Sequence, residues 1–220
     1  MKFAALYRLG KQNDGFSIGL LLRHIYYKLR YNLNMVLDNS VSIVNPRNIQ
    51  IPKGRLEVGF VGPEFVMRSD KTLLCCLGKV SVSGRVRINK GCRVYVAPKA
   101  QLFLSDCFVN SNVIIMCEHG VTIGANSAIG WGTQIIDDDY HSIQYANSCN
   151  AGFCADVRGG GVEIGNHVLI GNNCFIYKGV KIADGCVVAS NSVLKQSFAT
   201  PNKLISGNPA REIKDVVNWN

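Results

Sequence analysis

An aliphatic residue recurs at every sixth position in two blocks of this chain. The positions are Ile123, Ile129 and Ile135 in the first block, and Ile164, Ile170, Ile176, Ile182, Val188 and Leu194 in the second. A spacing of six matches neither the 3.6-residue period of an amphipathic helix nor the alternation of a simple strand. The pattern therefore predicts a short structural unit that is repeated many times.

Two further columns share this spacing. For seven of the nine aliphatics, the third residue after the aliphatic is Gly, Asn or His, the residue types that tolerate a positive φ, and the fourth is small. The columns hold Asn126, Gly132, His167, Asn173, Gly179, Gly185 and Asn191, and Ser127, Thr133, Val168, Cys174, Val180, Cys186 and Ser192. A short strand, a tight turn and another short strand form the hexapeptide β-helix repeat, of which three close a triangular coil. The sequence thus predicts an all-β solenoid.

The solenoid is predicted over residues 41–200, beginning with the β-prone segment "NPRNIQIPKGRLEVG". A helical segment, residues 1–40, precedes it, and a short C-terminal tail, residues 201–220, follows it. The run "FSIGLLLRHIYYKLRYNL" predicts an amphipathic helix. Its apolar face holds Ile18, Leu21, Leu22, Ile25 and Leu29.

We expect this helix to cap the open end of the solenoid. The alternative is a basic amphipathic helix that rests on an anionic membrane, which the aromatic rings of Tyr26, Tyr27 and Tyr31 would suit.

The two blocks are out of phase. Ile135 and Ile164 are 29 residues apart, which is not a multiple of six. A segment of about residues 137–161, rich in Gly, Asn, Ala and Ser, therefore leaves the repeat as a loop. Loops on a rigid scaffold often carry binding and catalytic residues. This one begins at "IIDDDYHSI".

His141 is the candidate catalytic base, because it opens this loop and a neutral imidazole is the usual base near neutral pH. The other histidines have structural interpretations: His167 occupies the turn column, His119 precedes a glycine at a turn, and His24 lies in the predicted helix. Asp138 or Asp139 would accept a hydrogen bond from the His141 ring and orient it, as in a catalytic triad. A solvated, charged turn is the alternative interpretation of these aspartates.

Composition narrows the class of protein. Apolar residues make up 47% of the 220 residues, with 22 glycines and 6 prolines, which is unlike a disordered chain. The net charge of +9 favours anionic partners such as phosphorylated cofactors, acidic glycans and membrane surfaces. Nucleic acid is not expected as a partner, because the basic residues are scattered and no recognition motif accompanies them.

The nine cysteines form no CxxC pair, and Cys75 and Cys76 are adjacent. We expect free thiols that act as small apolar side chains in a reducing compartment. No signal peptide and no apolar run of about 20 residues is visible, so the predicted location is cytoplasmic, with the inner face of the membrane as an alternative.

Several motifs occur together in a specific order: "VTIG", "DDDYHSI", "VEIGNHVLIGNNCFIYKGVKIADGCVVASNSVLKQ" and "SGNPAREIK". Over roughly residues 80–216 the chain resembles the hexapeptide-repeat acyltransferases. The likeness is to the serine, galactoside and maltose acetyltransferase branch and its polysaccharide O-acetyltransferase relatives. The resemblance implies a left-handed parallel β-helix and a homotrimer whose active sites lie between subunits. It also implies acetyl-CoA as cosubstrate, no metal requirement, and a histidine base that falls on His141.

The resemblance also implies roles for residues along the repeats. Gly171 and Asn172 match the turn near the thioester, and Ala189 matches the small residue beside the pantetheine arm. Lys195, Arg211 and Lys214 match the basic residues near the cofactor phosphates. On the acceptor side are Asn110 and Trp131; the latter is included because Leu169 stands where many members have tryptophan.

The predicted function is acetyl-CoA-dependent O-acetylation of a sugar hydroxyl in a bacterial surface polysaccharide or its precursor. Alternatives within the class are N-acetylation of a nucleotide amino sugar, or acetylation of a small molecule such as serine or a xenobiotic. A zinc carbonic anhydrase on the same scaffold is disfavoured, because three converging histidines are needed and no HxxxxH occurs. A non-catalytic solenoid is the remaining alternative.

Overall fold

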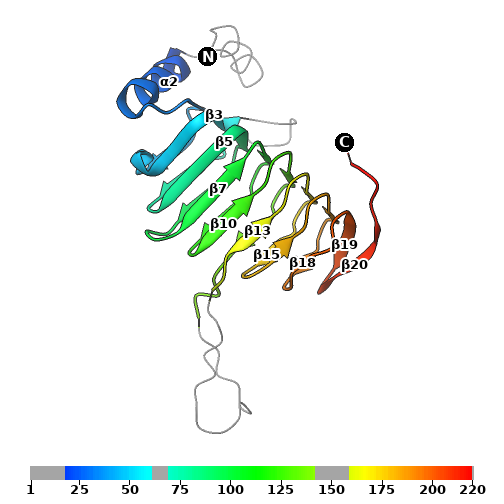
Figure 1. Cartoon of the computed structure of the whole chain (residues 1–220). Coiled ribbons are helices and arrows are strands. Elements are labelled where there is room, and N and C mark those ends of the chain that lie inside the picture. Colours follow the sequence, from blue (N-terminus) through cyan, green and yellow to red (C-terminus); the bar gives the residue numbers. More distant parts are fainter. Residues whose placement is uncertain (1–17, 61–68, 142–158, 220) are drawn as a thin grey trace, which may run out of the picture.

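A computed structural model describes residues 18–60, 69–141 and 159–219 and shows a parallel β-helix with one helix at its N-terminal end (Figure 1). The predicted solenoid is confirmed. Its strands stack into three faces. Helix α2 (Ile18–Tyr31) and the short 3-10 helix η1 (Pro46–Asn48) are the helical elements among the described residues.

The faces are named here in the order in which each coil visits them. The first face holds the N-terminal parts of β3 (Ile49–Phe60) and β5 (Lys79–Asn89), then β7 (Gln101–Ser105), β10 (Gly120–Ile123), β13 (Val162–Ile164) and β16 (Lys181–Ile182). The second face holds β1 (Met35–Leu37), the C-terminal parts of β3 and β5, β8 (Phe108–Val109), β11 (Ala128–Ile129), β14 (Leu169–Ile170), β17 (Val187–Val188), β19 (Lys203–Gly207) and β20 (Ala210–Asp215). The third face holds β2 (Val41–Val44), β4 (Thr72–Cys76), β6 (Arg93–Val96), β9 (Ile114–Cys117), β12 (Gln134–Ile136), β15 (Phe175–Tyr177) and β18 (Val193–Leu194).

The hexad aliphatics form the core, as predicted. In the parallel pairings Ile123 lies over Ile164 and Ile164 over Ile182, and the other two faces stack their aliphatics in the same way. None of the nine side chains is more than 3% exposed. Because burial of one such side chain is worth about 1.5–3 kcal/mol, these three stacks are a large part of the stability of the solenoid.

The turn column is also confirmed, with φ between 54° and 72° at all seven predicted positions. His167 is one of them, with a φ of 54°, so the prediction that it occupies a turn of the repeat is confirmed for its backbone. The small column is buried, and its hydroxyls join the coils: Ser127 Oγ donates to the Gly165 carbonyl at 2.9 Å, and Thr133 Oγ1 to the Gly171 carbonyl at 3.0 Å.

The loop leaves the repeat where the phase break predicts. The pairing of Ile123 with Ile164 advances 41 residues and that of Ile164 with Ile182 advances 18, so 23 residues lie outside the coil. Its root is closed by a bridge between Asp138 and Gly159, and residues 142–158 lie outside the described part of the chain.

Helix α2 caps the first coil, but not with the face that the sequence suggested. Leu20 is buried with Val36 and Phe60, and Tyr27 and Tyr31 pack against the solenoid core. The predicted apolar face is wrong as the packing surface: Ile18, Leu22, Ile25 and Leu29 are 72%, 60%, 42% and 81% exposed, and Leu21 is half-buried.

Side-chain hydrogen bonds explain this orientation. Arg23 Nη1 and Nη2 donate to the carbonyls of Asp38 (2.7 Å) and Val41 (2.8 Å), and His24 Nδ1 donates to the Met35 carbonyl at 2.6 Å. These bonds satisfy backbone carbonyls of the first coil, and they orient the side of the helix that carries Arg23 toward that coil. Within the described residues, no helix is long and apolar enough to cross a membrane.

The seven cysteines that the structure describes are free thiols, and six of them are buried. Burial raises the pKa of the Cys92 and Cys107 thiols to about 12. The prediction of apolar, unreactive thiols holds for them. Cys149 and Cys154 lie outside the described residues.

A glycine pair tests the close stacking of the coils. A Cβ on Gly124 would lie 2.4 Å from the Gly165 carbonyl oxygen, whereas a Cβ on Gly120 would meet only the Gln101 oxygen at 3.7 Å. We expect Gly124→Ala to lower the free energy of unfolding by about 1–3 kcal/mol, as overpacking does. The control Gly120→Ala should stay within about 1 kcal/mol of the parent. Equal effects of the two variants in denaturant unfolding would contradict this packing.

Candidate active site

Four of the predicted site positions form one row along the corner between the second and third faces. Each follows a strand of the second face on a successive coil: Asn110, Trp131, the Gly171–Asn172 pair and Ala189. Backbone bonds stack them, because Asn110 N donates to Ile129 O, Gly130 N to Ile170 O and Gly171 N to Val188 O at 2.8–2.9 Å. We call these residues the corner row.

The C-terminal end of the corner row is basic. Ala189 N donates to Ile205 O at 2.9 Å, which places β19 beside it. In the antiparallel hairpin of β19 and β20, Arg211 pairs with Ser206 and Lys214 with Leu204, and both basic side chains are exposed. The structure therefore brings Arg211 and Lys214 to the end of the row.

Lys195 lies off the row. It follows β18 at the far edge of the third face, where its Nζ is 5.8 Å from the centroid of the Tyr177 ring. The Tyr177 ring holds the Lys195 ammonium group on the third face. This position lies between the corner that carries the row and the corner that carries His141.

The Gly171 turn has a structural reason of its own. A Cβ on Gly171 would lie 2.5 Å from Ser190 N in the next coil, so glycine is needed there for the coils to stack. Asn172 joins three coils: its Oδ1 accepts from Trp131 N, and its N donates to Ser190 Oγ, both at 3.0 Å. The row is therefore rigid before any ligand arrives.

The three aspartates that follow β12 lie at the corner between the third and first faces, and the first of them is structural. Asp137 is fully buried, and its carboxylate accepts from the backbone N of Glu118, His119 and Gly120 at 2.7–2.9 Å. Asp137 is thus not part of a solvated turn. It fixes the corner of the preceding coil, beside the point where the loop begins.

Asp138 bonds to a histidine other than the predicted one. Its Oδ2 is 2.7 Å from His119 Nε2, and its Oδ1 accepts from Tyr140 N at 2.6 Å. Gly159, where the loop returns, packs on the same ring, because a Cβ there would lie 1.7 Å from His119 Nε2. His119 and Asp138 thus hold the loop root together, and His119 does not share the left-handed backbone of His167.

Asp139 pairs with Lys178 Nζ at 2.5 Å, and His141 is exposed at the last described position before the loop. The carboxylate partners that the structure gives are therefore His119 and Lys178. That Asp138 or Asp139 orients the His141 ring stays a prediction.

Tyr140 completes this corner. Burial raises the pKa of its hydroxyl, as do the negative charges of Glu118, Asp137 and Asp138, so the hydroxyl stays protonated throughout the neutral range. The loop corner therefore combines carboxylates, a neutral phenol and two imidazoles, contributed by two successive coils.

One chain does not bring His141 to the corner row. His141 follows β12, whereas Trp131 precedes it, so the width of the third face separates the two corners. The strand between them carries Gln134 and Ile136 outward, both half-buried.

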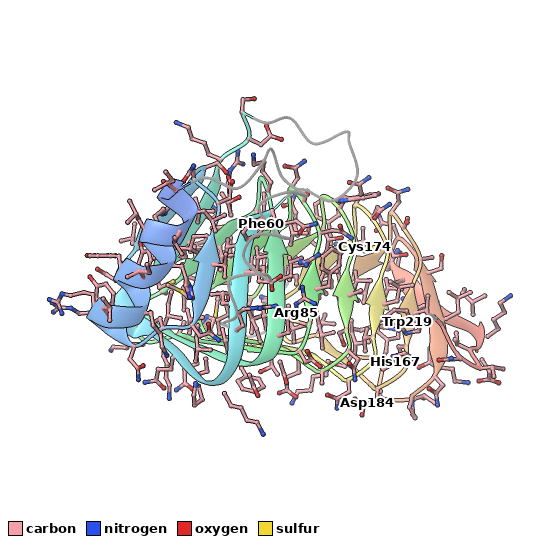
Figure 2. All side chains as sticks on the ribbon, turned by 90° about the horizontal axis from the view of Figure 1, so that it is seen from above. Phe60, Arg85, His167, Cys174, Asp184 and Trp219 are labelled. Atoms are coloured by element: carbon pink, nitrogen blue, oxygen red, sulfur yellow. The ribbon has the colours of Figure 1, made fainter. Side chains whose placement is uncertain are left out.

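A groove of about 660 Å³ lies on the second face, beside the row. Its lining includes Arg85, Arg87, Phe108, Asn126, His167 and Trp219, and Figure 2 shows three of these, Arg85, His167 and Trp219, on one side of the solenoid. Phe108 begins β8 and Asn110 follows it, so the groove and the row lie at the two ends of the same short strand.

The groove is electropositive because one buried carboxylate is shared by several arginines. Glu57 is fully buried; its oxygens accept from Arg85 Nε and Nη2 at 3.2 and 3.1 Å and from Arg87 Nε at 3.1 Å, and Arg55 also pairs with it. Three cations exceed the charge of Glu57, and the Asp106 carboxylate, which also lines the groove, offsets part of the surplus. The groove is therefore weakly positive, and its fixed guanidinium groups favour an anion.

Trp219 closes one side of the groove. Its ring stacks on His167 with centroids 4.5 Å apart, and its Nε1 donates to the His167 carbonyl at 2.8 Å. His167 therefore has a second structural task besides its turn. In the described residues, no three His, Cys, Asp or Glu side chains are grouped closely enough to hold a metal ion.

Sequence reasoning missed the pairing of His119 with Asp138. The two residues are 19 positions apart and belong to successive coils, so no local spacing signals the contact. The glycine run 159–161 was a partial signal, because a chain that returns without side chains can pack directly against a ring.

Comparisons with known proteins agree with this fold. Residues 161–196 match the model for the bacterial transferase hexapeptide family (six repeats). An uncharacterized 24.8 kDa protein in the cps region of Klebsiella pneumoniae is 36% identical over 203 residues, 92% of this chain and 88% of the relative. A putative lipopolysaccharide biosynthesis O-acetyl transferase of Escherichia coli K12, WbbJ, is 30% identical over 62% of this chain and 72% of its own.

The fold is also that of a solved structure. AntD, an N-acyltransferase from Bacillus cereus of which a point mutant was crystallised with dTDP and coenzyme A, aligns over 93% of this chain and 91% of its own, with a TM-score of 0.58 and 20% identity. At this identity the likeness concerns the fold alone.

A double-mutant cycle on unfolding free energy tests which histidine Asp138 supports. We expect Asp138→Asn and His119→Phe to be coupled by about 0.5–1 kcal/mol, because the two side chains bond directly and are partly exposed. The matched cycle of Asp138→Asn with His141→Ala should show a smaller coupling. The assignment of Asp138 to His119 is wrong if the second coupling exceeds the first.

Proposed function

This chain belongs to the bacterial hexapeptide-repeat acetyltransferases, and from that premise we propose that it transfers the acetyl group of acetyl-CoA to a sugar hydroxyl in a surface polysaccharide or its precursor. The observation that carries the proposal is the corner row, a rigid line of small and polar turns that ends in the basic β19–β20 hairpin.

The row suits a long ligand with phosphates at one end. Arg211 and Lys214 would hold the phosphates of CoA, with Lys195 as a further cation on the adjoining face. Ala189 has a short side chain that leaves room for the pantetheine arm, and Gly171 with Asn172 would face the thioester. The coenzyme A in the AntD crystal structure belongs to a protein of the same fold and is in keeping with this assignment.

In the proposed reaction His141 is the general base. Its imidazole removes the proton of the acceptor hydroxyl while the oxygen attacks the thioester carbonyl carbon. The C–S bond then breaks, and the leaving sulfur of CoA takes the proton from the imidazolium. We keep the prediction that Asp138 or Asp139, at the same corner, orients the ring.

We propose that the enzyme is a homotrimer. His141 and the corner row lie on different corners of one prism, so a neighbouring copy must supply the row that faces each His141. A cyclic arrangement of three copies, with the same head-to-tail contact at each interface, would form three such sites.

The acceptor would lie beside Asn110 and Trp131, with the groove on the second face accommodating the rest of the saccharide. The surplus charge of Arg85 and Arg87 favours an acceptor that carries an acidic group, and Trp219 offers an aromatic ring at its edge. The name of the E. coli relative, a putative lipopolysaccharide biosynthesis O-acetyl transferase, supports a surface glycan as the acceptor.

The function is tested by measuring CoA release from acetyl-CoA with neutral and acidic oligosaccharides and with nucleotide amino sugars. We expect turnover with a hydroxyl acceptor and a loss of about 10²- to 10⁴-fold in kcat for His141→Ala, the usual contribution of a general base. His119→Phe is the matched control and should retain most of the activity. Equal turnover of the His141 variant and the parent, or transfer only to amines, would contradict the proposal.

Complementation tests the shared site. His141→Ala and Ala189→Trp should each be inactive, the first lacking the base and the second blocking the row. Co-expressed in equal amounts, they should recover about one quarter of the parent activity, because that fraction of interfaces in a mixed cyclic trimer carries two intact halves. A preparation with no recovered activity, despite a trimer mass by light scattering, would place both halves of the site in one chain.

A further inference from the structure

The outer face of helix α2 is an apolar surface that the solenoid does not use. Ile18, Leu22, Ile25 and Leu29 are 42–81% exposed, and Tyr26 beside them is 53% exposed. At helical spacing these five side chains fall on one side, opposite Leu20, Tyr27 and Tyr31, which pack inward. A continuous apolar helix face turned to solvent is unusual, because such faces normally pack against a core.

The orientation of this face is fixed by the fold. Arg23 and His24 donate three hydrogen bonds of 2.6–2.8 Å to backbone carbonyls at the first coil, and Leu20 is anchored against Phe60. The helix therefore cannot roll its apolar side inward without losing these bonds. Figure 1 shows α2 at the N-terminal end of the solenoid, at the opposite end from the C-terminal hairpin.

The charges around this face are all of one sign. Lys28 and Arg30 are exposed in the last turn, and at 100° per residue they fall on the two opposite borders of the apolar face. The helix contains no acidic residue. Long basic side chains at the borders of an apolar stripe can reach anionic headgroups while the stripe enters the acyl region.

We propose that α2 docks the enzyme on an anionic lipid surface, with its outer face inserted at the level of the headgroups. The exposed aliphatics supply the buried apolar area, and Lys28 and Arg30 supply the attraction to the lipid phosphates. The interaction is peripheral, since the helix is too short to span a bilayer. The corner row and the loop corner lie on coils further along the solenoid, so they stay accessible when this end is docked.

A second copy of this chain fits the face less well. Two such faces packed symmetrically would bring Lys28 and Arg30 of each copy toward the same cations of the other, with no carboxylate on either helix to compensate. Like charges across an interface oppose association, whereas an anionic membrane neutralises both of them.

The test is co-sedimentation of the full chain with vesicles of phosphatidylcholine alone and of phosphatidylcholine mixed with phosphatidylglycerol. We expect the parent to bind the mixed vesicles at least about tenfold more tightly than the neutral ones, and less tightly as salt is raised. The double variants Leu22→Ser/Leu29→Ser and Lys28→Glu/Arg30→Glu should each lose about tenfold or more of this affinity.

The control variant is Leu73→Ser/Phe103→Ser, which removes two apolar side chains that are each 40% exposed on the sides of the solenoid. It should bind the mixed vesicles as the parent does, and unchanged thermal unfolding should show that all variants are folded. The proposal is overturned if the parent ignores both vesicles, or if the helix variants bind as well as the parent. Loss of subunits from the assembly by light scattering in the Leu22→Ser/Leu29→Ser variant, without loss of vesicle binding, would assign the face to a second copy instead.

Discussion

Everything in this molecule depends on the stacking of aliphatic side chains at six-residue intervals inside the coils. Each hexad contributes one side chain to the interior, and Ile123, Ile164 and Ile182 show how successive coils align them. The stack forces a tight turn after every strand, which is why Gly, Asn and His occupy positions with φ between 54° and 72°. It also leaves no room between coils, as the 2.4 Å distance from a Cβ on Gly124 to the Gly165 oxygen demonstrates.

The candidate site follows from this regularity and from its one interruption. Because each coil repeats the last, residues of the same column form a straight row, and Asn110, Trp131, Gly171 and Ala189 lie together although 79 positions separate the first from the last. The loop after β12 interrupts the repeat only because Asp137 first fixes the corner with three backbone hydrogen bonds. The row lies on one corner and the root of the loop on another, and the proposed site shared between copies of the chain rests on this separation.

Charge is distributed unevenly over this frame. Arg211 and Lys214 are at the C-terminal end of the row, Arg85 and Arg87 share the buried Glu57 beside the groove, and Lys28 and Arg30 border the outer face of α2. Part of the positive charge of the chain thus lies on three separate surfaces. Each suits a different anion: the phosphates of a cofactor, an acidic sugar and a lipid headgroup.

The sequence by itself determined the repeat, the columns and the phase break, because each depends on spacing along the chain. The buried aliphatics, the left-handed turns and the place where the loop departs could all be counted from Ile123 to Leu194. The residues of the corner row were predicted from the family resemblance, and the solenoid converts their spacing in the sequence into spatial neighbours.

Only the tertiary structure decided what lies across coils or depends on competing contacts. Asp138 bonds to His119, 19 positions earlier, because the two residues follow neighbouring strands at the same corner of successive coils. The amphipathic helix α2 was predicted, but the side with Leu20, Arg23 and His24 faces the solenoid, where Arg23 and His24 donate hydrogen bonds to carbonyls of the first coil. The periodicity of the sequence specifies which residues share a face of a helix or strand. The contacts available in the folded chain decide whether that face packs against the core or is exposed to solvent.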